Sequence, residues 1–201
     1  MKRFFLILLA LLMVAAVFSG CSKNDVSEST TPIAPTETEP KPVAPELEYT
    51  DVTSMMYGEL LGKKVDNCGL PQDSLFLEGD KVKGFDYLCM GDVVGNVTCY
   101  FDESGITSYT FGSQPFDNAE TFKTAYDIIN DSIASGLGQD VAASTFHGGS
   151  NDEDQMESLF KGNGVIKSVY KTADVVVTVT GCGVNNVATI VIECAAVGTE
   201  G

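Results

Sequence analysis

Six runs along the chain have the composition of β-strands. They are rich in valine, isoleucine, threonine and aromatic residues, and several alternate between apolar and polar positions. Loops of two and four residues join the first three runs, and such loops connect antiparallel neighbours, so we predict a meander. The predicted strands are Val82–Met90, Val93–Phe101, Ile106–Phe111, Val165–Lys171, Asp174–Thr180 and Val187–Cys194.

Two segments repeat apolar residues at helical spacing, one before each group of three strands. The first begins at Asp51, which can cap a helix, and ends at Gly62. The second opens at Asp117 and Glu120, which resemble a capping box, and stops between Gly136 and Gly138. Their apolar stripes are Val52, Met56, Leu60 and Leu61 in the first helix, and Phe122, Tyr126, Ile129, Ile133 and Leu137 in the second.

A shorter helix is predicted after residue 150. Ser150 and Glu153 form a capping box, and the helix that they open would bury Met156, Leu159 and Phe160. The same acidic stretch could be taken for a calcium-binding loop, but it lacks the central glycine that an EF-hand loop needs. We therefore expect a helix cap here and no metal site.

Short sequence matches relate the two halves of this region. The matching segments are separated by 76, 84 and 82 residues and occur in the same order, namely 60–65 with 136–141, 74–76 with 158–160 and 92–94 with 174–176. We predict an internal duplication of a helix-plus-three-strand unit, with repeats at 51–112 and 117–195. Because each unit alone would expose an apolar sheet face, the two units must share a core.

The predicted fold class is therefore α+β, with two helix-plus-three-strand units sharing a core and helices on one face of an antiparallel sheet. This order of elements, with Leu61-Gly62 and Leu137-Gly138 at the helix ends, resembles the tandem repeats of the beta-lactamase inhibitor protein family. The resemblance implies a binding surface on the open face of the sheet and no catalysis, although an architecture alone does not establish a function.

The first 21 residues have the three parts of a secretory signal peptide. Lys2 and Arg3 precede an apolar run of 15 residues, which is followed by Ser19, Gly20 and Cys21. This ending resembles the lipobox of bacterial lipoproteins, in which the cysteine is acylated and lipoprotein signal peptidase cleaves before it. The resemblance implies lipidation of Cys21, cleavage between Gly20 and Cys21, and localisation at the extracytoplasmic face of the cell membrane. The alternative is a retained anchor, for which the apolar run is short.

Three regions follow from these patterns. Residues 1–20 are the predicted lipoprotein signal peptide, and 21–48 comprise the lipidated cysteine and a disordered tether rich in serine, threonine, proline and glutamate. Residues 49–197 form a single α+β domain, which is an ordinary size for one domain. Membrane contact is therefore expected through a lipid anchor, since two or more acyl chains give stable attachment.

The charge of the chain excludes nucleic acid as a partner. The full sequence has a net charge of −16, and loss of Lys2 and Arg3 with the leader would leave ten lysines, no arginine and 28 acidic residues, or about −18. Such a polyanion repels phosphate backbones and lacks the arginine fork that binds phosphate.

Few residues are suited to catalysis. His147 is the single histidine, no serine lies in a nucleophile elbow, and the many carboxylates single out no pair. Beyond Cys21 an odd number of cysteines remains, without the spacing of a zinc site, and we interpret most of them as small core residues with one disulfide as an alternative. We predict no catalytic residue, metal or cofactor. These cysteines are Cys68, Cys89, Cys99, Cys182 and Cys194.

We therefore predict a cell-envelope lipoprotein whose domain binds an unknown protein or cell-wall ligand. Tyr100, Tyr109 and Phe111 are predicted to lie together on one face of the meander and form the candidate binding surface. Two alternatives stay open. These aromatic residues could instead be core under the helices, and the protein could be a cell-envelope enzyme without a readable motif.

Overall fold

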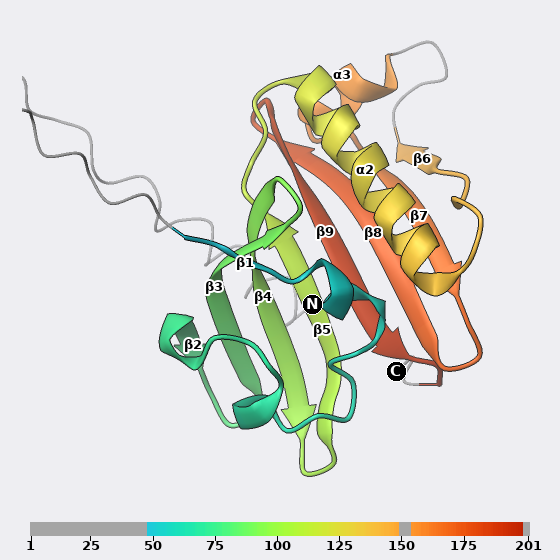
Figure 1. The fold of residues 1–201 in the computed structure, drawn as a ribbon. Helices are drawn as coiled ribbons and strands as arrows, with labels where there is room; N and C mark the ends of the chain where they lie inside the picture. The colour runs from blue at the N-terminus through green and yellow to red at the C-terminus, as the bar shows by residue number, and fades with distance from the viewer. Residues whose placement is uncertain (1–47, 149–153, 199–201) are drawn as a thin grey trace, which may run out of the picture. The chain divides into compact units, whose positions relative to one another are not determined.

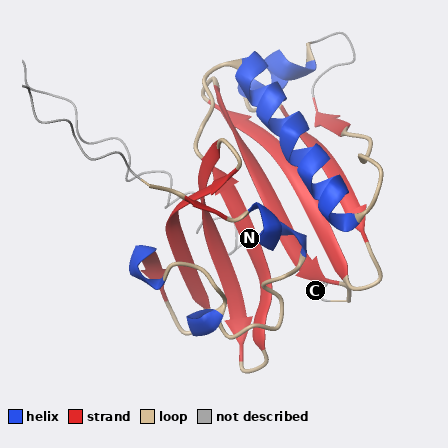
Figure 2. Ribbon diagram, viewed as in Figure 1, coloured by secondary structure: helices blue, strands red, loops and turns tan. Residues whose placement is uncertain are grey.

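The computed structural model describes residues 48–148 and 154–198 (Figure 1). These residues form one sheet with helices, as the colouring of strands and helices in Figure 2 makes clear. The predicted signal peptide and nearly all of the predicted tether, including Gly20 and Cys21, lie outside the described residues. Ser150 and Glu153 of the predicted capping box also lie outside them.

The strands of the described residues form one nine-stranded sheet in the order β1-β3-β4-β5-β9-β8-β7-β6, with β2 beside β3. Neighbouring strands are antiparallel except β1 and β3, which run parallel. The bounds are β1 Thr50–Asp51, β2 Leu75–Glu78, β3 Val82–Met90, β4 Val93–Asp102, β5 Gly105–Ser113, β6 Thr145–Gly148, β7 Gly164–Lys171, β8 Val175–Val184 and β9 Val187–Ala196.

All six predicted strands are present, as β3, β4, β5, β7, β8 and β9, and the antiparallel sheet is confirmed. Met90 pairs with Val93 and Cys89 with Val94, as expected for a two-residue turn between β3 and β4. β5 pairs with β9 from Ser108 opposite Ala195 to Gly112 opposite Val191. This pairing joins the two meanders into one continuous sheet.

The predicted helix over 51–62 is wrong in type and length. A 3-10 helix, η1 (Thr53–Tyr57), occupies its start and ends at Gly58, which adopts a φ of 103°. A left-handed glycine stops a helix after one turn here, although Met56 is fully buried as the periodicity predicted. Both α-helices of the described residues therefore lie in the second half, and the expected pair of helix-plus-three-strand units is not observed there.

Helix α2 (Ala119–Leu137) matches the second predicted helix, but its cap is one residue later than predicted. The Asn118 side chain, and not that of Asp117, accepts hydrogen bonds from the backbone N–H groups of Glu120 at 2.9 Å and Thr121 at 3.0 Å. Gly138 ends the helix with a φ of 62°. Within the predicted apolar stripe, Phe122, Tyr126, Ile129 and Ile133 are buried and Leu137 is partly buried.

Helix α3 (Gln155–Phe160) is the short helix predicted in this region. It buries Leu159 and Phe160 as expected, whereas Met156 is only partly buried. Its first residue follows Asp154, whose side chain accepts a hydrogen bond from the Met156 backbone N–H at 2.9 Å. The observed cap is thus Asp154.

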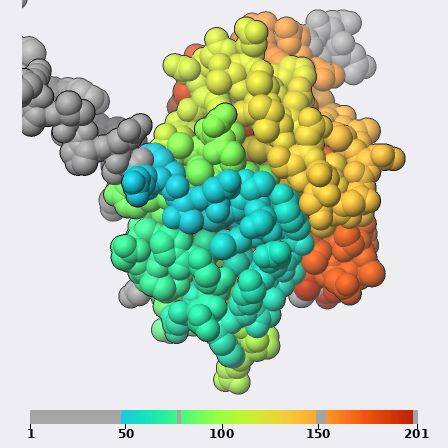
Figure 3. Space-filling model, in the orientation of Figure 1, coloured from blue at the N-terminus to red at the C-terminus, as the bar shows by residue number. Residues whose placement is uncertain are grey.

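The core lies between one face of the sheet and the layer formed by α2, α3 and the segment around η1 (Figure 1). Figure 3 shows this layer covering the sheet. Glycines allow the close approach: a Cβ at Gly181 of β8 would lie 2.5 Å from the Phe122 ring of α2, and a Cβ at Gly136 would lie 2.5 Å from the Tyr57 ring. The helices and the sheet therefore share a single core.

Candidate binding surface

The structure separates the three aromatic residues of the predicted binding surface. Tyr109 and Phe111 are fully buried in the core. The Tyr109 hydroxyl donates to the backbone oxygen of Met55 at 2.6 Å and accepts from the backbone N–H of Gly58 at 2.8 Å, so it fixes the η1 segment to the sheet. For these two residues the core interpretation is correct, and neither belongs to a binding surface.

Tyr100 lies on the opposite face of the sheet and is 43% exposed. Tyr109 pairs with Cys99, whereas Tyr100 pairs with Ser108, and the register shifts between Tyr100 and Phe101. Because side chains alternate between faces, a register change of one residue reverses the face on which a side chain lies. The prediction that Tyr100 shares a face with Tyr109 is therefore wrong.

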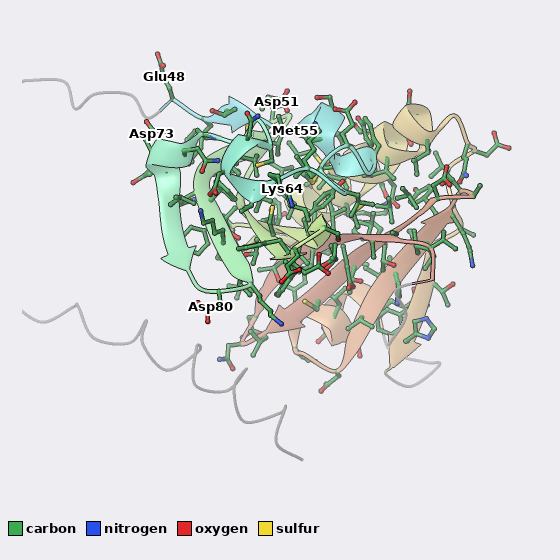
Figure 4. The ribbon with its side chains drawn as sticks, turned by 90° about the horizontal axis from the view of Figure 1, so that it is seen from below. Glu48, Asp51, Met55, Lys64, Asp73 and Asp80 are labelled. Carbon is green, nitrogen blue, oxygen red and sulfur yellow. The ribbon has the colours of Figure 1, made fainter. Side chains whose placement is uncertain are left out.

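The face that carries Tyr100 points away from α2 and is here called the open face. In Figure 4, helices lie above the sheet, and side chains of the sheet project below it, on the other side. A central row on this face crosses four adjacent strands, with each residue directly opposite the next. The row consists of Thr98 of β4, Thr110 of β5, Glu193 of β9 and Thr178 of β8.

Uncharged side chains surround this row. The residues on either side alternate with buried core residues along each strand and are partly or well exposed. Adjacent strands lie about 4.8 Å apart, so four strands span about 14 Å. The neighbouring rows contain Tyr100, Ser108, Ala195 and Val176 on one side, and Asn96, Gly112, Val191 and Thr180 on the other.

Glu193 is the feature of the open face that the sequence-based prediction missed. Its side chain is exposed, and it is the single charged residue in β8 and β9. A single charged residue within two strands of apolar residues and threonine is visible in the sequence, and this signal could have identified Glu193 as a candidate binding residue. A carboxylate that is kept in the middle of an otherwise uncharged surface is suited to pairing with a basic group of a ligand.

Cavities lie elsewhere on the described surface, among them three that differ in their lining residues. One of about 700 Å³ lies beside the β4–β5 turn and is lined by Asp80, Lys81 and residues 101–104. A second, of about 400 Å³, lies between the β3–β4 turn and α2, with Asp92, Glu120 and the exposed Ile128 among its lining residues. The third, of about 360 Å³, lies at the edge of the sheet where β1 and β2 flank β3.

The cysteines of the described residues are free thiols. Burial, with a smaller contribution from nearby Cys68, raises the pKa of Cys99 to about 12. Burial likewise raises the pKa of Cys194 to about 11, and a hydrogen bond with Tyr109 offsets part of that effect. Thiols with such raised pKa values stay protonated at neutral pH and are poor nucleophiles. Cys99 and Cys194 are therefore core residues, in agreement with the sequence-based interpretation.

Residues suited to other chemistry are dispersed. His147 is exposed on β6, at the edge of the sheet. Within residues 48–148 and 154–198, no group of three or more histidine, cysteine, aspartate or glutamate side chains is arranged to hold a metal ion. No helix in the same residues is long and apolar enough to cross a membrane.

We found no match to this chain among protein-family models, curated proteins or solved structures.

Proposed function

We propose that this protein is a lipoprotein anchored at the extracytoplasmic face of a membrane, and that it binds a protein partner on the open face of its sheet. The observation that carries the binding proposal is the central row of Thr98, Thr110, Glu193 and Thr178, which is uncharged except for Glu193. In a chain of net charge −16, such a surface contrasts with the rest of the molecule.

The composition of the open face favours a protein as the ligand. The core of a protein interface is depleted of charged residues and its rim is polar and accessible to solvent. Apart from Glu193, the central row has the composition of such a core, and Lys167 and Lys171 lie on the neighbouring strand β7. Tyr100 adds an exposed aromatic side chain, a residue type enriched in interfaces. The partner would place a lysine or arginine opposite Glu193, because a carboxylate at the centre of an interface needs a partner of opposite charge.

Photo-cross-linking in intact cells tests the binding proposal. A photoreactive amino acid at Thr110, in the middle of the open face, is expected to capture a defined partner. The matched control places the same amino acid at Asp131, which is exposed on α2. If position 110 gives no product beyond those formed from position 131, the open face is not the binding surface.

Charge reversal at Glu193 tests the role assigned to its carboxylate. Glu193→Lys should lower the yield of the product formed from position 110 at least tenfold, because it sets two positive charges against each other. Asp140→Lys makes the same change in charge at an exposed position after α2 and should leave the yield unchanged. Equal yields in the two variants would contradict the proposed charge pairing.

The anchor proposal rests on Ser19, Gly20 and Cys21 at the end of the apolar leader. Replacement of Cys21 by serine removes the thiol that would carry the acyl chains, so the protein should leave the membrane fraction. Cys182→Ser, a change at a partly exposed cysteine of β8, controls for cysteine loss and should stay membrane-bound. Complete retention of the Cys21→Ser variant in membranes would show that the leader itself anchors the chain.

We also infer that the two meanders arose by duplication. The strand order is symmetric about the pair of β5 and β9, which are the third strands of the two meanders. Outward from this pair, each meander continues with its second and then its first strand, β4 and β3 on one side and β8 and β7 on the other. The inference is limited to the strands, because the helices of the two halves differ.

A further inference from the structure

The cavity at the edge of the sheet where β1 and β2 flank β3 differs in its chemistry from the open face. It lies between β1, the 3-10 helix η3 (Gln72–Ser74) and β3, and its volume of about 360 Å³ is within the range of small-molecule sites. Figure 4 shows Glu48 and Asp73 together at this edge, whereas Asp80 lies apart from them. The cavity is lined by Glu48, Thr50, Pro71, Asp73, Ser74 and Tyr87.

Tyr87 forms an aromatic wall of the cavity, and a bulge in β3 positions it there. The pairing of β3 with β4 is interrupted between Phe85 and Leu88, so Asp86 and Tyr87 project from the ladder. Tyr87 has a φ of 55°, and its backbone N–H donates to Oδ1 of Asp86 at 2.8 Å. This conformation leaves the Tyr87 side chain 47% exposed at the cavity.

A second ring, that of Tyr49, lies beside the Tyr87 ring. β1 pairs with β3 through Thr50 and Leu88, which brings the preceding residue, Tyr49, beside the bulge. The ring centroids of Tyr49 and Tyr87 are 6.5 Å apart, with an angle of 44° between the ring planes. Tyr49 is 36% exposed but is not among the residues that line the cavity, so Tyr87 is the ring that a ligand in the cavity would meet.

The charged groups of the cavity all have the same sign. Glu48 and Asp73 provide two carboxylates, and no lysine is among the residues that line it. An anion would therefore be repelled. A cation placed against the face of Tyr87 would gain from the ring and from the carboxylates together, because the face of an aromatic ring carries negative charge.

We propose that this cavity binds an organic cation, a quaternary or protonated alkylammonium group, with its methyl or methylene groups against Tyr87 and its charge facing Glu48 and Asp73. A bare metal ion fits less well, since it would gain little from an aromatic wall and needs more oxygen ligands than two separate carboxylates give. The site is separate from the open face, and the proposal does not depend on that of a protein partner there.

Titration of the purified full-length protein with choline tests this site. Ligand-observed NMR should show saturable binding of choline in the millimolar range, weakened by salt. The neutral isostere 3,3-dimethylbutan-1-ol has the same shape without the charge and should bind at least fivefold more weakly. Absence of saturable choline binding, or equal binding of the two compounds, would overturn the proposal.

Variants assign the binding to the cavity. Tyr87→Gly removes the ring but accepts the positive φ, and it should weaken choline binding at least threefold, whereas Tyr87→Phe should keep it. Asp73→Asn should also weaken binding. Tyr100→Ala and Asp80→Asn are the controls, a similarly exposed tyrosine and a distant exposed aspartate, and should bind choline normally.

Thermal unfolding of each variant shows that it is folded before binding is compared. Unchanged choline binding in folded Tyr87→Gly would overturn the site assignment. Glu193→Lys should bind choline normally, and Tyr87→Gly should still form the cross-link from position 110. The two proposals can therefore fail independently.

Discussion

At the scale of single residues, Gly105 shows how strictly the backbone constrains the turn between β4 and β5. Its φ is 127°, and a Cβ there would lie 2.5 Å from the backbone oxygen of Gly62. An alanine here would have both an unfavourable φ and a clash with backbone, and movement of a side chain can relieve neither. Gly105→Ala should therefore lower the free energy of unfolding by about 2–4 kcal/mol. Urea unfolding measures this change.

Gly112 is the matched control for Gly105. It lies on the same strand, its φ is not positive, and the nearest atom to an added Cβ would be Oδ1 of Asn96 at 3.6 Å. Gly112→Ala should change the free energy of unfolding by less than about 1 kcal/mol. Equal effects of the two substitutions would show that the conformation assigned to Gly105 is wrong.

The buried thiols give the protein an alkaline limit to its stability. The pKa values of Cys99 and Cys194, about 12 and about 11, lie above the 9.0 expected for an unfolded chain. Stability from these groups is therefore complete below pH 9 and is lost as the pH rises toward their folded pKa values. Between pH 9 and 11 the free energy of unfolding should fall by about 1.4 kcal/mol per pH unit for each thiol.

Urea unfolding of the wild type and of the Cys99→Ala, Cys194→Ala double variant at several alkaline pH values tests this prediction. The double variant loses packing at every pH, so the slope with pH, and not the absolute stability, is compared. Its slope should be smaller than that of the wild type. Identical slopes would show that the two thiols do not ionise on unfolding.

At the scale of elements, the start of α2 distinguishes the predicted cap from the observed one. Asn118 accepts two backbone hydrogen bonds, whereas Asp117 is exposed and precedes the cap. Asn118→Ala should lower the free energy of unfolding by about 1 kcal/mol, because it leaves these N–H groups without the side-chain acceptor. Asp117→Ala is the control and should change it by less than about 0.5 kcal/mol. If Asp117→Ala lowered the free energy of unfolding more than Asn118→Ala, the predicted cap at Asp117 would be correct.

Elements with a clear period could be predicted from the sequence. The strands from Val82 to Met90 and from Val93 onward, and the long helix α2, follow from alternation, turn residues and helical spacing. The 3-10 helix η1 could not be predicted, because its apolar residues have the spacing of an α-helix. The helix ends early because Gly58 adopts a positive φ. Short edge strands such as β6 lack enough residues to show any period.

The candidate sites depend on strand register and on a β-bulge, which the hydrophobic periodicity of the sequence does not reveal. Tyr100 and Tyr109 both lie in correctly predicted strands, yet the register shift beside Tyr100 places them on opposite faces. Tyr87 lies in the middle of a predicted strand, and its exposure follows from a bulge that no pattern in β3 indicates. The type of an element is thus predictable from pattern, whereas the face of the sheet on which a side chain lies depends on register.

At the scale of the whole molecule, the seam between β5 and β9 makes the two meanders one cooperative unit. Phe111 of β5 lies opposite Ile192 of β9, Ile192 lies opposite Val179 of β8, and all three are fully buried. The same core extends on both sides of the seam. The domain should therefore unfold in one transition, as most domains of this size do.

Hydrogen exchange of an Ile192→Val variant tests this cooperativity. Loss of one buried methylene group should cost about 0.5–1.5 kcal/mol. The most protected amides of β4 and of β8 should lose the same free energy of opening, because both open only with the whole domain. Val169→Ala, a change at an exposed position of β7, should leave exchange in both strands nearly unchanged. A loss of protection confined to β8 and β9 would mean that the meanders open separately, and that the open face, which crosses the seam, can be divided without unfolding either half.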